Sequence, residues 1–313
     1  MIFYASGAIT DEASLELVVR HRIALLTSYA YKNAFKKQAP LLCALLRAQR
    51  LRLPYMLDSG AFTAWNKGKE VNREALIDFY NWAVDEYADA LDFTLVSLDR
   101  IPGKQGVPRT ADDYKQAAEE TVANYEYMRE RVRGYVKPVY HDGEPEWVLA
   151  HYADAKYLSV SANQDLSYNE REAWVARTAA GVLAGRKLHG LAMTGARMLR
   201  TVRWHSVDSA AWVLWAGYGA IAWLRDDGTL KIMPASAESP RRKMFDAHLS
   251  TLSPVERDRI VAALEAEGLT LEQVAVDTMA RSRWNILVFH RACEWASARP
   301  VVGAHQMEGL FDA

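Results

Sequence analysis

The chain has 313 residues, half of them apolar and a quarter charged, which indicates a globular protein with a full-sized core and excludes a disordered or fibrous chain. Its 38 Lys and Arg nearly balance its 39 Asp and Glu, so any nucleic acid must meet a local basic patch. Two cysteines, Cys43 and Cys293, exclude a disulfide framework and suit a reducing compartment. Without a charged leader or a run of 18 apolar residues, we expect a cytoplasmic protein that does not contact membranes.

One unit recurs along the chain: a short apolar run, a polar turn and an amphipathic helix. This alternation is typical of a parallel β/α architecture. The clearest helix is predicted over residues 72–87 behind a capping Asn72, and another begins at Thr110, with Asp113 three residues later. Eight strands are predicted, at residues 2–6, 24–28, 55–57, 93–98, 135–140, 157–160, 188–193 and 205–207.

Eight strands in roughly 215 residues favour an α/β fold of the TIM type, a (β/α)8 barrel, although the eighth helix is hard to place. An open doubly wound sheet is the alternative. Residues 219–233 predict a hairpin inserted after the eighth strand, with its turn at 226–228. We therefore expect a barrel with the active site at 1–250 and a helical tail packed on it at 251–313. The tail helices are predicted to start at Ser253 and Thr270 and to include residues 284–296.

Three predicted strands are followed by an aspartate: Asp58, Asp99 and Asp208. In barrels of this type the reacting groups lie at the carboxyl ends of the strands. Carboxylates at such a mouth can have shifted pKa values and can divide into nucleophile, base and recognition roles. Each aspartate alone could equally cap the next helix or turn. The three together favour a site, because independent caps would more often be a mixture with Ser, Thr or Asn.

The most specific stretch is 57–62, Leu-Asp-Ser-Gly-Ala-Phe, where small residues let the backbone approach a flat ligand and Phe62 offers a ring for stacking. It resembles the Asp-Ser-Gly-Gly-aromatic motif of the tRNA-guanine transglycosylase superfamily, with Ala61 in place of the second glycine. Residues 190–192, Gly-Leu-Ala, resemble an element of that family's seventh strand. Asp208-Ser209 resembles its nucleophile dipeptide, in which a cysteine follows the aspartate, and the hairpin resembles the segment after it.

The resemblance covers roughly residues 55–233 and implies a base exchange in two displacements. It implies that Asp208 attacks the anomeric carbon and expels the genomic base, leaving a covalent glycosyl-enzyme. By the same resemblance, Asp58 exchanges a proton with the outgoing and incoming bases.

The resemblance also implies a base pocket. Asp99 and Ser59 would hydrogen-bond the base edge, the Gly190 backbone would line the pocket, and Phe62 would stack on the ring. His141 stands where the family has a glutamine followed by glycines. It either binds the base or serves as a structural hydrogen-bonding group.

The chain departs from the tRNA enzymes after the barrel, where those enzymes close a zinc site with three cysteines and a histidine. This half holds only Cys293, with His290 three residues before it, so we expect no zinc and no cofactor apart from the exchanged base. The family's zinc region helps to hold tRNA. Its loss favours the branch encoded by bacteriophages and bacterial islands, which replaces guanine in DNA by a 7-deazaguanine such as preQ0. The strings at 58–65 and 206–209, with Trp212, resemble that branch.

The expected partners are therefore DNA and a free 7-deazaguanine base. Three alternatives stay open: a tRNA-guanine transglycosylase, a barrel N-glycoside hydrolase that uses the same carboxylates with water, and a non-catalytic nucleic-acid-binding barrel. Arg197, Arg200 and Arg203 are spaced by three, which predicts phosphate contacts from one face beside Asp208, or else a solvated helix face. A base inside a duplex would have to be extruded. The particular deazapurine and the oligomeric state do not follow from the sequence.

Overall fold

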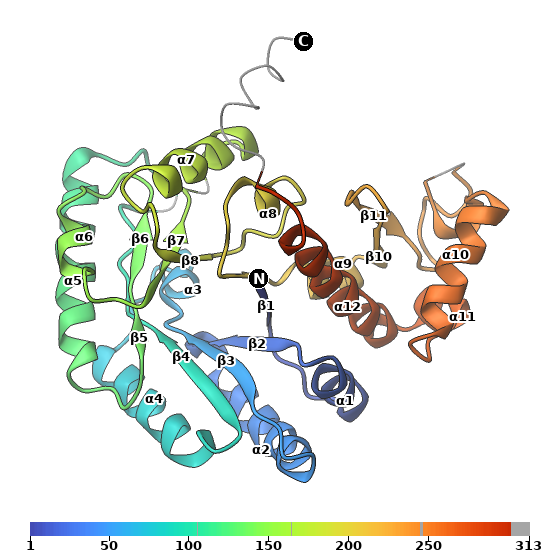
Figure 1. Cartoon of the computed structure of the whole chain (residues 1–313), viewed down its shortest axis with the longest axis horizontal. Coiled ribbons are helices and arrows are strands. Elements are labelled where there is room, and N and C mark those ends of the chain that lie inside the picture. The colour runs from blue at the N-terminus through green and yellow to red at the C-terminus, as the bar shows by residue number, and fades with distance from the viewer. Residues whose placement is uncertain (105, 164, 245–246, 302–313) are drawn as a thin grey trace.

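In the computed structural model, which describes residues 1–104, 106–163, 165–244 and 247–301, parallel strands form a nearly closed barrel (Figure 1). The strands are β1 (Ile2–Ser6), β2 (Ala24–Ser28), β3 (Leu53–Asp58), β4 (Leu91–Val96), β5 (Val136–Lys137), β6 (Val139–His141), β7 (Tyr157–Ser161), β8 (Lys187–Gly190) and β9 (Ser206–Ser209). They pair in the order β5-β4-β3-β2-β1-β9-β8-β7-β6. This arrangement confirms the predicted TIM-type barrel, and the alternative of an open doubly wound sheet is wrong.

The barrel closes around Pro138. Strand β5 pairs with β4, β6 pairs with β7, and Pro138 separates β5 from β6 in the chain. Proline has no N–H to donate to a sheet, so the single strand predicted at 135–140 is divided here. The Pro138 carbonyl still accepts the Ser159 N–H at 2.8 Å, which keeps β7 attached across the break. Counting β5 and β6 as one, the described chain has the eight barrel strands that the sequence predicts.

Other strand bounds differ from the predictions for local reasons. The strand predicted at 188–193 ends at Gly190, and Ala192, with a left-handed φ of 56°, turns the chain two residues later. Asp208 lies within β9 rather than after it, because pairing with β1 continues to Ser209. The strand predicted at 93–98 is shifted toward the N-terminus, so Asp99 stands three residues beyond the end of β4.

Helices follow the strands on the outside of the barrel (Figure 1). The caps read from the sequence are present: Asn72 accepts the Ala75 N–H, and Thr110 forms a capping box with Asp113. No helix in the described ranges is long and apolar enough to cross a membrane. The helices along the barrel are α1 (Glu12–His21), α2 (Lys32–Ala48), α3 (Ala61–Asn66), α4 (Arg73–Tyr87), α5 (Ala111–Arg129), α6 (Val148–His151), α7 (Tyr168–Ala180) and α8 (Met198–Thr201).

After β9 the chain forms α9 (Ala211–Gly217) and the predicted hairpin, with β10 at Ala220–Leu224 and β11 at Leu230–Pro234. Helices α10 (Pro254–Glu265), α11 (Leu271–Val276) and α12 (Thr278–Ser297) follow. Helix α12 begins before the predicted residue 284, because Asp277 caps it. It packs on β1 and contacts α1 and α8, where an eighth barrel helix would lie (Figure 1). Its Trp284 is fully buried and donates from Nε1 to the Ala222 carbonyl at 2.7 Å.

Candidate active site

A cavity of about 380 Å³ opens at the carboxyl ends of the strands, and we call it the mouth cavity. Asp58 at the end of β3, Asp99 in the loop after β4, and Asp208 in β9 all line it. The Phe62 ring lines it too. The structure therefore brings together three aspartates that lie up to 150 residues apart in the sequence.

Asp58 sits at a tight turn between β3 and α3. Its Oδ2 accepts the Gly60 N–H at 3.0 Å. Gly60 has a left-handed φ of 78°, which favours glycine, and a Cβ there would lie only 3.0 Å from the Ala30 backbone nitrogen. Burial, followed by the nearby charge of Asp99, raises the pKa of Asp58 to about 6. A carboxyl group with that pKa can both accept and release a proton near neutral pH.

Asp99 is held from two sides. The Ser59 hydroxyl donates to its Oδ1 at 3.0 Å, and His141 Nε2 lies 2.9 Å from its Oδ2. On the other side of the ring, His141 Nδ1 lies 2.9 Å from Glu144 Oε1, and the His141 backbone N–H donates to Glu144 Oε2. Burial alone would lower the pKa of His141, but the two carboxylates raise it to about 10. His141 is therefore an imidazolium whose two N–H groups both point at carboxylates, which favours the structural alternative for this residue.

Asp208 has a different environment. Its Oδ1 accepts the Ala192 N–H at 3.0 Å, and His189 Nε2 lies 3.3 Å from the same oxygen. Burial, followed by the positive charge of Lys137, lowers the pKa of His189 to about 4, so its imidazole is neutral. The other ring nitrogen of His189 lies 2.7 Å from the Ser206 hydroxyl, which fixes the orientation of the ring.

Lys137, His189 and Glu144 are site residues that sequence reasoning missed. Lys137 is fully buried, and its Nζ donates to Met56 Sδ at 3.2 Å and lies 5.2 Å from the Tyr157 ring centroid. Burial lowers the pKa of Lys137 well below its ordinary value, although the Asp208 and Asp58 charges act against this. A signal was present, because a charged or polar residue interrupts each of the apolar runs at 135–140 and 188–193. For Glu144, the only signal in the sequence was its position three residues after His141.

The remaining predicted base-binding residues take varied positions. Ser59 is fully buried and acts on Asp99. Gly190 is required by packing, because a Cβ there would lie 2.9 Å from Met193 Cβ and 3.1 Å from the Trp204 ring. The residues after it, 191–193, line the mouth cavity. The Phe62 side chain is 41% exposed and stacks on Trp65, with the ring centroids 6.0 Å apart.

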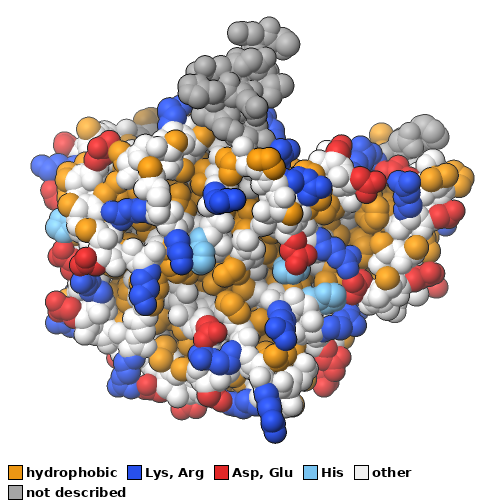
Figure 2. Space-filling model, viewed as in Figure 1, with side chains coloured by type: hydrophobic (Ala, Val, Ile, Leu, Met, Phe, Trp, Pro, Cys, Tyr) orange, Lys and Arg blue, Asp and Glu red, His pale blue; other side chains and the backbone are white. Residues whose placement is uncertain are grey.

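The three predicted phosphate-binding arginines face different neighbours, because α8 has only four residues. Arg197 precedes α8 and pairs with Glu172 at 2.6 Å. The Arg200 guanidinium lies 5.6 Å from the Trp295 ring centroid of α12, and Arg203 follows α8 in an exposed position. On the face shown in Figure 2, Lys and Arg are interspersed with Asp and Glu. A phosphate-binding role for these arginines stays a prediction.

The cysteine considered for a metal is part of the core. Cys293 is buried in α12, and burial raises the pKa of its thiol to about 12. His290, one turn earlier, lies 3.5 Å from Glu294. Within the ranges that the structure describes, no three His, Cys, Asp or Glu side chains form a group that could hold a metal ion.

No family model matches this chain, and no curated protein matches it either. The solved structures that match include the tryptophan synthase α chain from Legionella pneumophila subsp. pneumophila. That match has a TM-score of 0.41 and 10% sequence identity, and covers 94% of this chain and 91% of that chain. A likeness of this degree supports no functional argument, so the function must be argued from the site.

Proposed function

We propose that this protein is a DNA-guanine transglycosylase, which exchanges guanine in DNA for a 7-deazaguanine base through a covalent intermediate on Asp208. The observation that carries the proposal is the convergence of three aspartates with different environments on the mouth cavity. Base exchange needs a nucleophile, a group that transfers a proton and a fixed acceptor for the base edge. Asp208, Asp58 and Asp99 have the surroundings that suit these three roles.

In the first displacement, an Asp208 oxygen attacks C1′ of the target deoxyguanosine. The C1′–N9 bond breaks, N9 keeps the electron pair, and Asp58 supplies a proton to the departing guanine. Both contacts of the Asp208 carboxylate fall on Oδ1, so the attack would use Oδ2. The neutral His189 and the Ala192 N–H hold the carboxylate without neutralising its charge, which preserves its nucleophilicity.

The second displacement reverses these steps. Asp58 takes a proton from the incoming base, whose N9 attacks C1′ and releases Asp208. A pKa of about 6 suits Asp58 to both directions, because the group is neither fully protonated nor a very weak base near pH 7. Atoms and charge balance, since one base replaces another and the proton returns.

Recognition of the base follows from the ion pair between Asp99 and His141. An ionised carboxylate only accepts hydrogen bonds, and the N1–H and 2-amino groups of guanine only donate them. His141 Nε2 lies against Asp99 Oδ2 and the Ser59 hydroxyl donates to Oδ1, so the two contacts fix the rotation of the Asp99 carboxyl group. A 7-deazaguanine carries the same donors at N1 and N2, so Asp99 would accept either base, with Phe62 available to stack on the ring.

The test is an exchange assay on three substrates: duplex DNA, single-stranded DNA and tRNA, each with preQ0. The digested nucleosides are analysed by mass spectrometry, with the exposed Asp154→Asn variant as a control for Asp208→Asn. We expect a deazaguanine nucleoside in DNA for the parent and Asp154→Asn, and none for Asp208→Asn. Product in tRNA alone would indicate the tRNA enzyme, free guanine without exchange would indicate a hydrolase, and no reaction on any substrate would overturn the proposal.

A further inference from the structure

A second cavity of about 130 Å³ adjoins the mouth cavity, and we call it the side cavity. We propose that it binds the nucleotide next to the target nucleotide in the same strand, an inference that rests on the proposed function of the mouth cavity. Phe62, Ile101, Ser161 and Ala162 line both cavities, so they share a wall. On this measure one water molecule needs about 10–15 Å³, so the side cavity exceeds a single hydration site.

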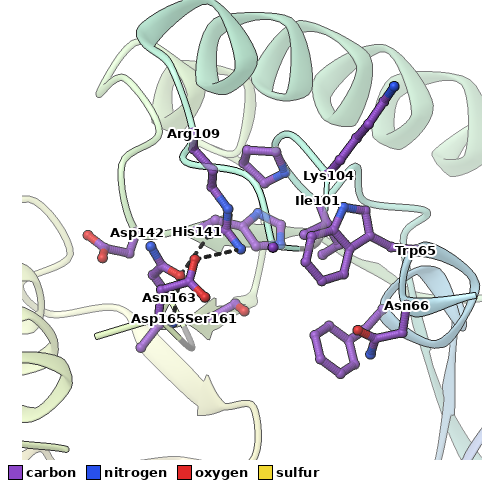
Figure 3. Close-up of a pocket in the computed structure, with 14 residues that line it drawn as sticks. Trp65, Asn66, Ile101, Lys104, Arg109, His141, Asp142, Ser161, Asn163 and Asp165 are labelled. Atoms are coloured by element: carbon purple, nitrogen blue, oxygen red, sulfur yellow. Dashed lines mark hydrogen bonds and ion pairs between the residues drawn. The ribbon is translucent and has the colours of Figure 1, made fainter. Parts of the chain in front are cut away.

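One wall of the side cavity is aromatic (Figure 3). The Phe62 and Trp65 rings lie 6.0 Å apart with 28° between their planes. Trp65 is fixed by its Nε1, which donates to the Gly103 carbonyl at 2.8 Å. Proteins that hold single-stranded nucleic acid use such fixed rings as stacking surfaces, because every base has a π face. The wall is therefore suited to a planar heterocycle.

The opposite wall is polar. Figure 3 shows Asp142, Asn163 and Asp165 across the cavity from Trp65. Arg109 joins the two walls: its Nη1 donates to Asn163 Oδ1 at 2.8 Å, and its guanidinium lies 5.6 Å from the Trp65 ring centroid. Amide and carboxylate oxygens on this wall can accept hydrogen bonds from the amino groups of a base.

Charge within the side cavity is divided between its two sides. Asp142 and Asp165 lie on the polar wall, and Arg109 Nη2 is 3.4 Å from Asp165 Oδ2. Lys104 is exposed and extends on the Trp65 side (Figure 3). A phosphate would avoid the carboxylates and lie near Lys104, while the base occupies the slot. The ligand chemistry is thus a planar base that carries an anionic group, which describes a nucleotide.

The shared wall identifies which nucleotide this is. A target nucleotide that reaches Asp208 in the mouth cavity brings its neighbours in the strand to the rim of that cavity. Phe62 lines both cavities and would lie between the target base and its neighbour. A free nucleotide has the same chemistry, so the experiment must distinguish a linked from a free nucleotide.

The experiment compares the binding of the trinucleotide d(AGA) and of free dGMP by titration calorimetry. Trp65→Leu removes the stacking surface. Trp147→Leu is the control, because it makes the same replacement at a tryptophan that is 41% exposed and lines neither cavity. We expect Trp65→Leu to weaken d(AGA) binding by about 5- to 100-fold and dGMP binding by less than about 2-fold. Trp147→Leu should bind both ligands like the parent, and circular dichroism verifies that both variants fold.

Lys104→Gln provides a second measurement that does not depend on replacing a partly buried ring. Lys104→Gln should remove one phosphate contact from d(AGA) binding. The slope of the logarithm of the binding constant against the logarithm of salt concentration should therefore change by about 0.7. Lys156→Gln is the control, because Lys156 is exposed just before β7, at the opposite end of the barrel from the cavities. An unchanged slope in Lys104→Gln would remove the phosphate from this position and overturn the proposal.

The outcomes separate this inference from the proposed function. If d(AGA) binding depends on Trp65 but no nucleic acid undergoes base exchange, the side cavity is supported and the transglycosylase proposal falls. If exchange occurs while Trp65→Leu and Trp147→Leu bind d(AGA) equally well, the side-cavity proposal alone is wrong. Equal losses for d(AGA) and dGMP in Trp65→Leu would show a site for a free nucleotide and overturn the neighbouring-nucleotide proposal.

Discussion

Replacing Asp58 with asparagine tests the electrostatics of the mouth cavity without any knowledge of the substrate. An aspartate has an ordinary pKa of about 3.9, and each pH unit of change is worth about 1.4 kcal/mol. Burial and the charge of Asp99 raise the pKa of Asp58 to about 6. The ionised Asp58 carboxylate therefore destabilises the folded chain by up to about 3 kcal/mol relative to the unfolded chain.

The direction of the Asp58 pKa shift determines the pH range in which the stability changes. Between about pH 4 and pH 6, folded Asp58 holds a proton that the unfolded chain has released, so the free energy of unfolding falls as pH rises. Asp58→Asn does not titrate, and its amide oxygen can still accept the Gly60 N–H. We expect the variant to match the parent near pH 4 and to be more stable by up to about 3 kcal/mol above pH 6.

The measurement is the melting temperature of the parent and of the variant across pH 4 to 8, with unfolding monitored by circular dichroism. A gain of up to about 3 kcal/mol corresponds to roughly 5 °C in a chain of this length. Asp154→Asn, at an exposed position, should show no pH-dependent difference from the parent. A difference between Asp58→Asn and the parent that is the same at pH 4 and pH 8 would refute the assigned environment of Asp58.

Three further predictions address the other charged groups. Asp208→Asn should eliminate the covalent nucleic-acid adduct in denaturing mass spectrometry, and an adduct that persists would remove Asp208 as nucleophile. The His141 imidazole should remain doubly protonated in nitrogen NMR up to about pH 9, because its pKa is raised to about 10. Glu144→Gln should move that titration to lower pH, whereas titration near pH 6.5 in the parent would contradict the ion-pair geometry. Lys137→Met should stabilise the chain by about 1 kcal/mol or more at pH 7. The buried ammonium group next to Met56 has lost its hydration, and a methionine side chain has none to lose. A lower melting temperature for Lys137→Met would contradict this.

The barrel could be predicted from the sequence because its signals are local. Strands β1 and β2 have the predicted bounds, since each is a short apolar run flanked by polar turns. Helix α12 shows the limit of such reasoning. Its sequence indicates a helix, but its position between α1 and α8 depends on contacts with β1, which lies over 270 residues away in the chain. Packing over such a separation leaves no pattern in a single sequence.

The site shows the same division between local and distant information. The aspartates could be found because barrel strands place their carboxyl ends at one edge. The chemical differences between the aspartates could not be predicted, because the environment of each depends on residues from other strands. His141 lies against Asp99, and His189 lies against Asp208. His141 carried an ambiguous signal for the same reason. Whether its ring nitrogens face a base or a carboxylate depends on Glu144 and Asp99, which only the folded chain places at 2.9 Å.

The cavity holds three carboxylates, and their mutual repulsion must be limited for the barrel to remain stable. The His141 imidazolium lies against Asp99, while burial, followed by the Asp99 charge, raises the pKa of Asp58. Removing the charge of His141 should therefore raise the pKa of Asp58 further, because Asp99 would then act on Asp58 with an uncompensated charge. On this reasoning, the division of roles between two neighbouring aspartates depends on a histidine that itself need not touch the base.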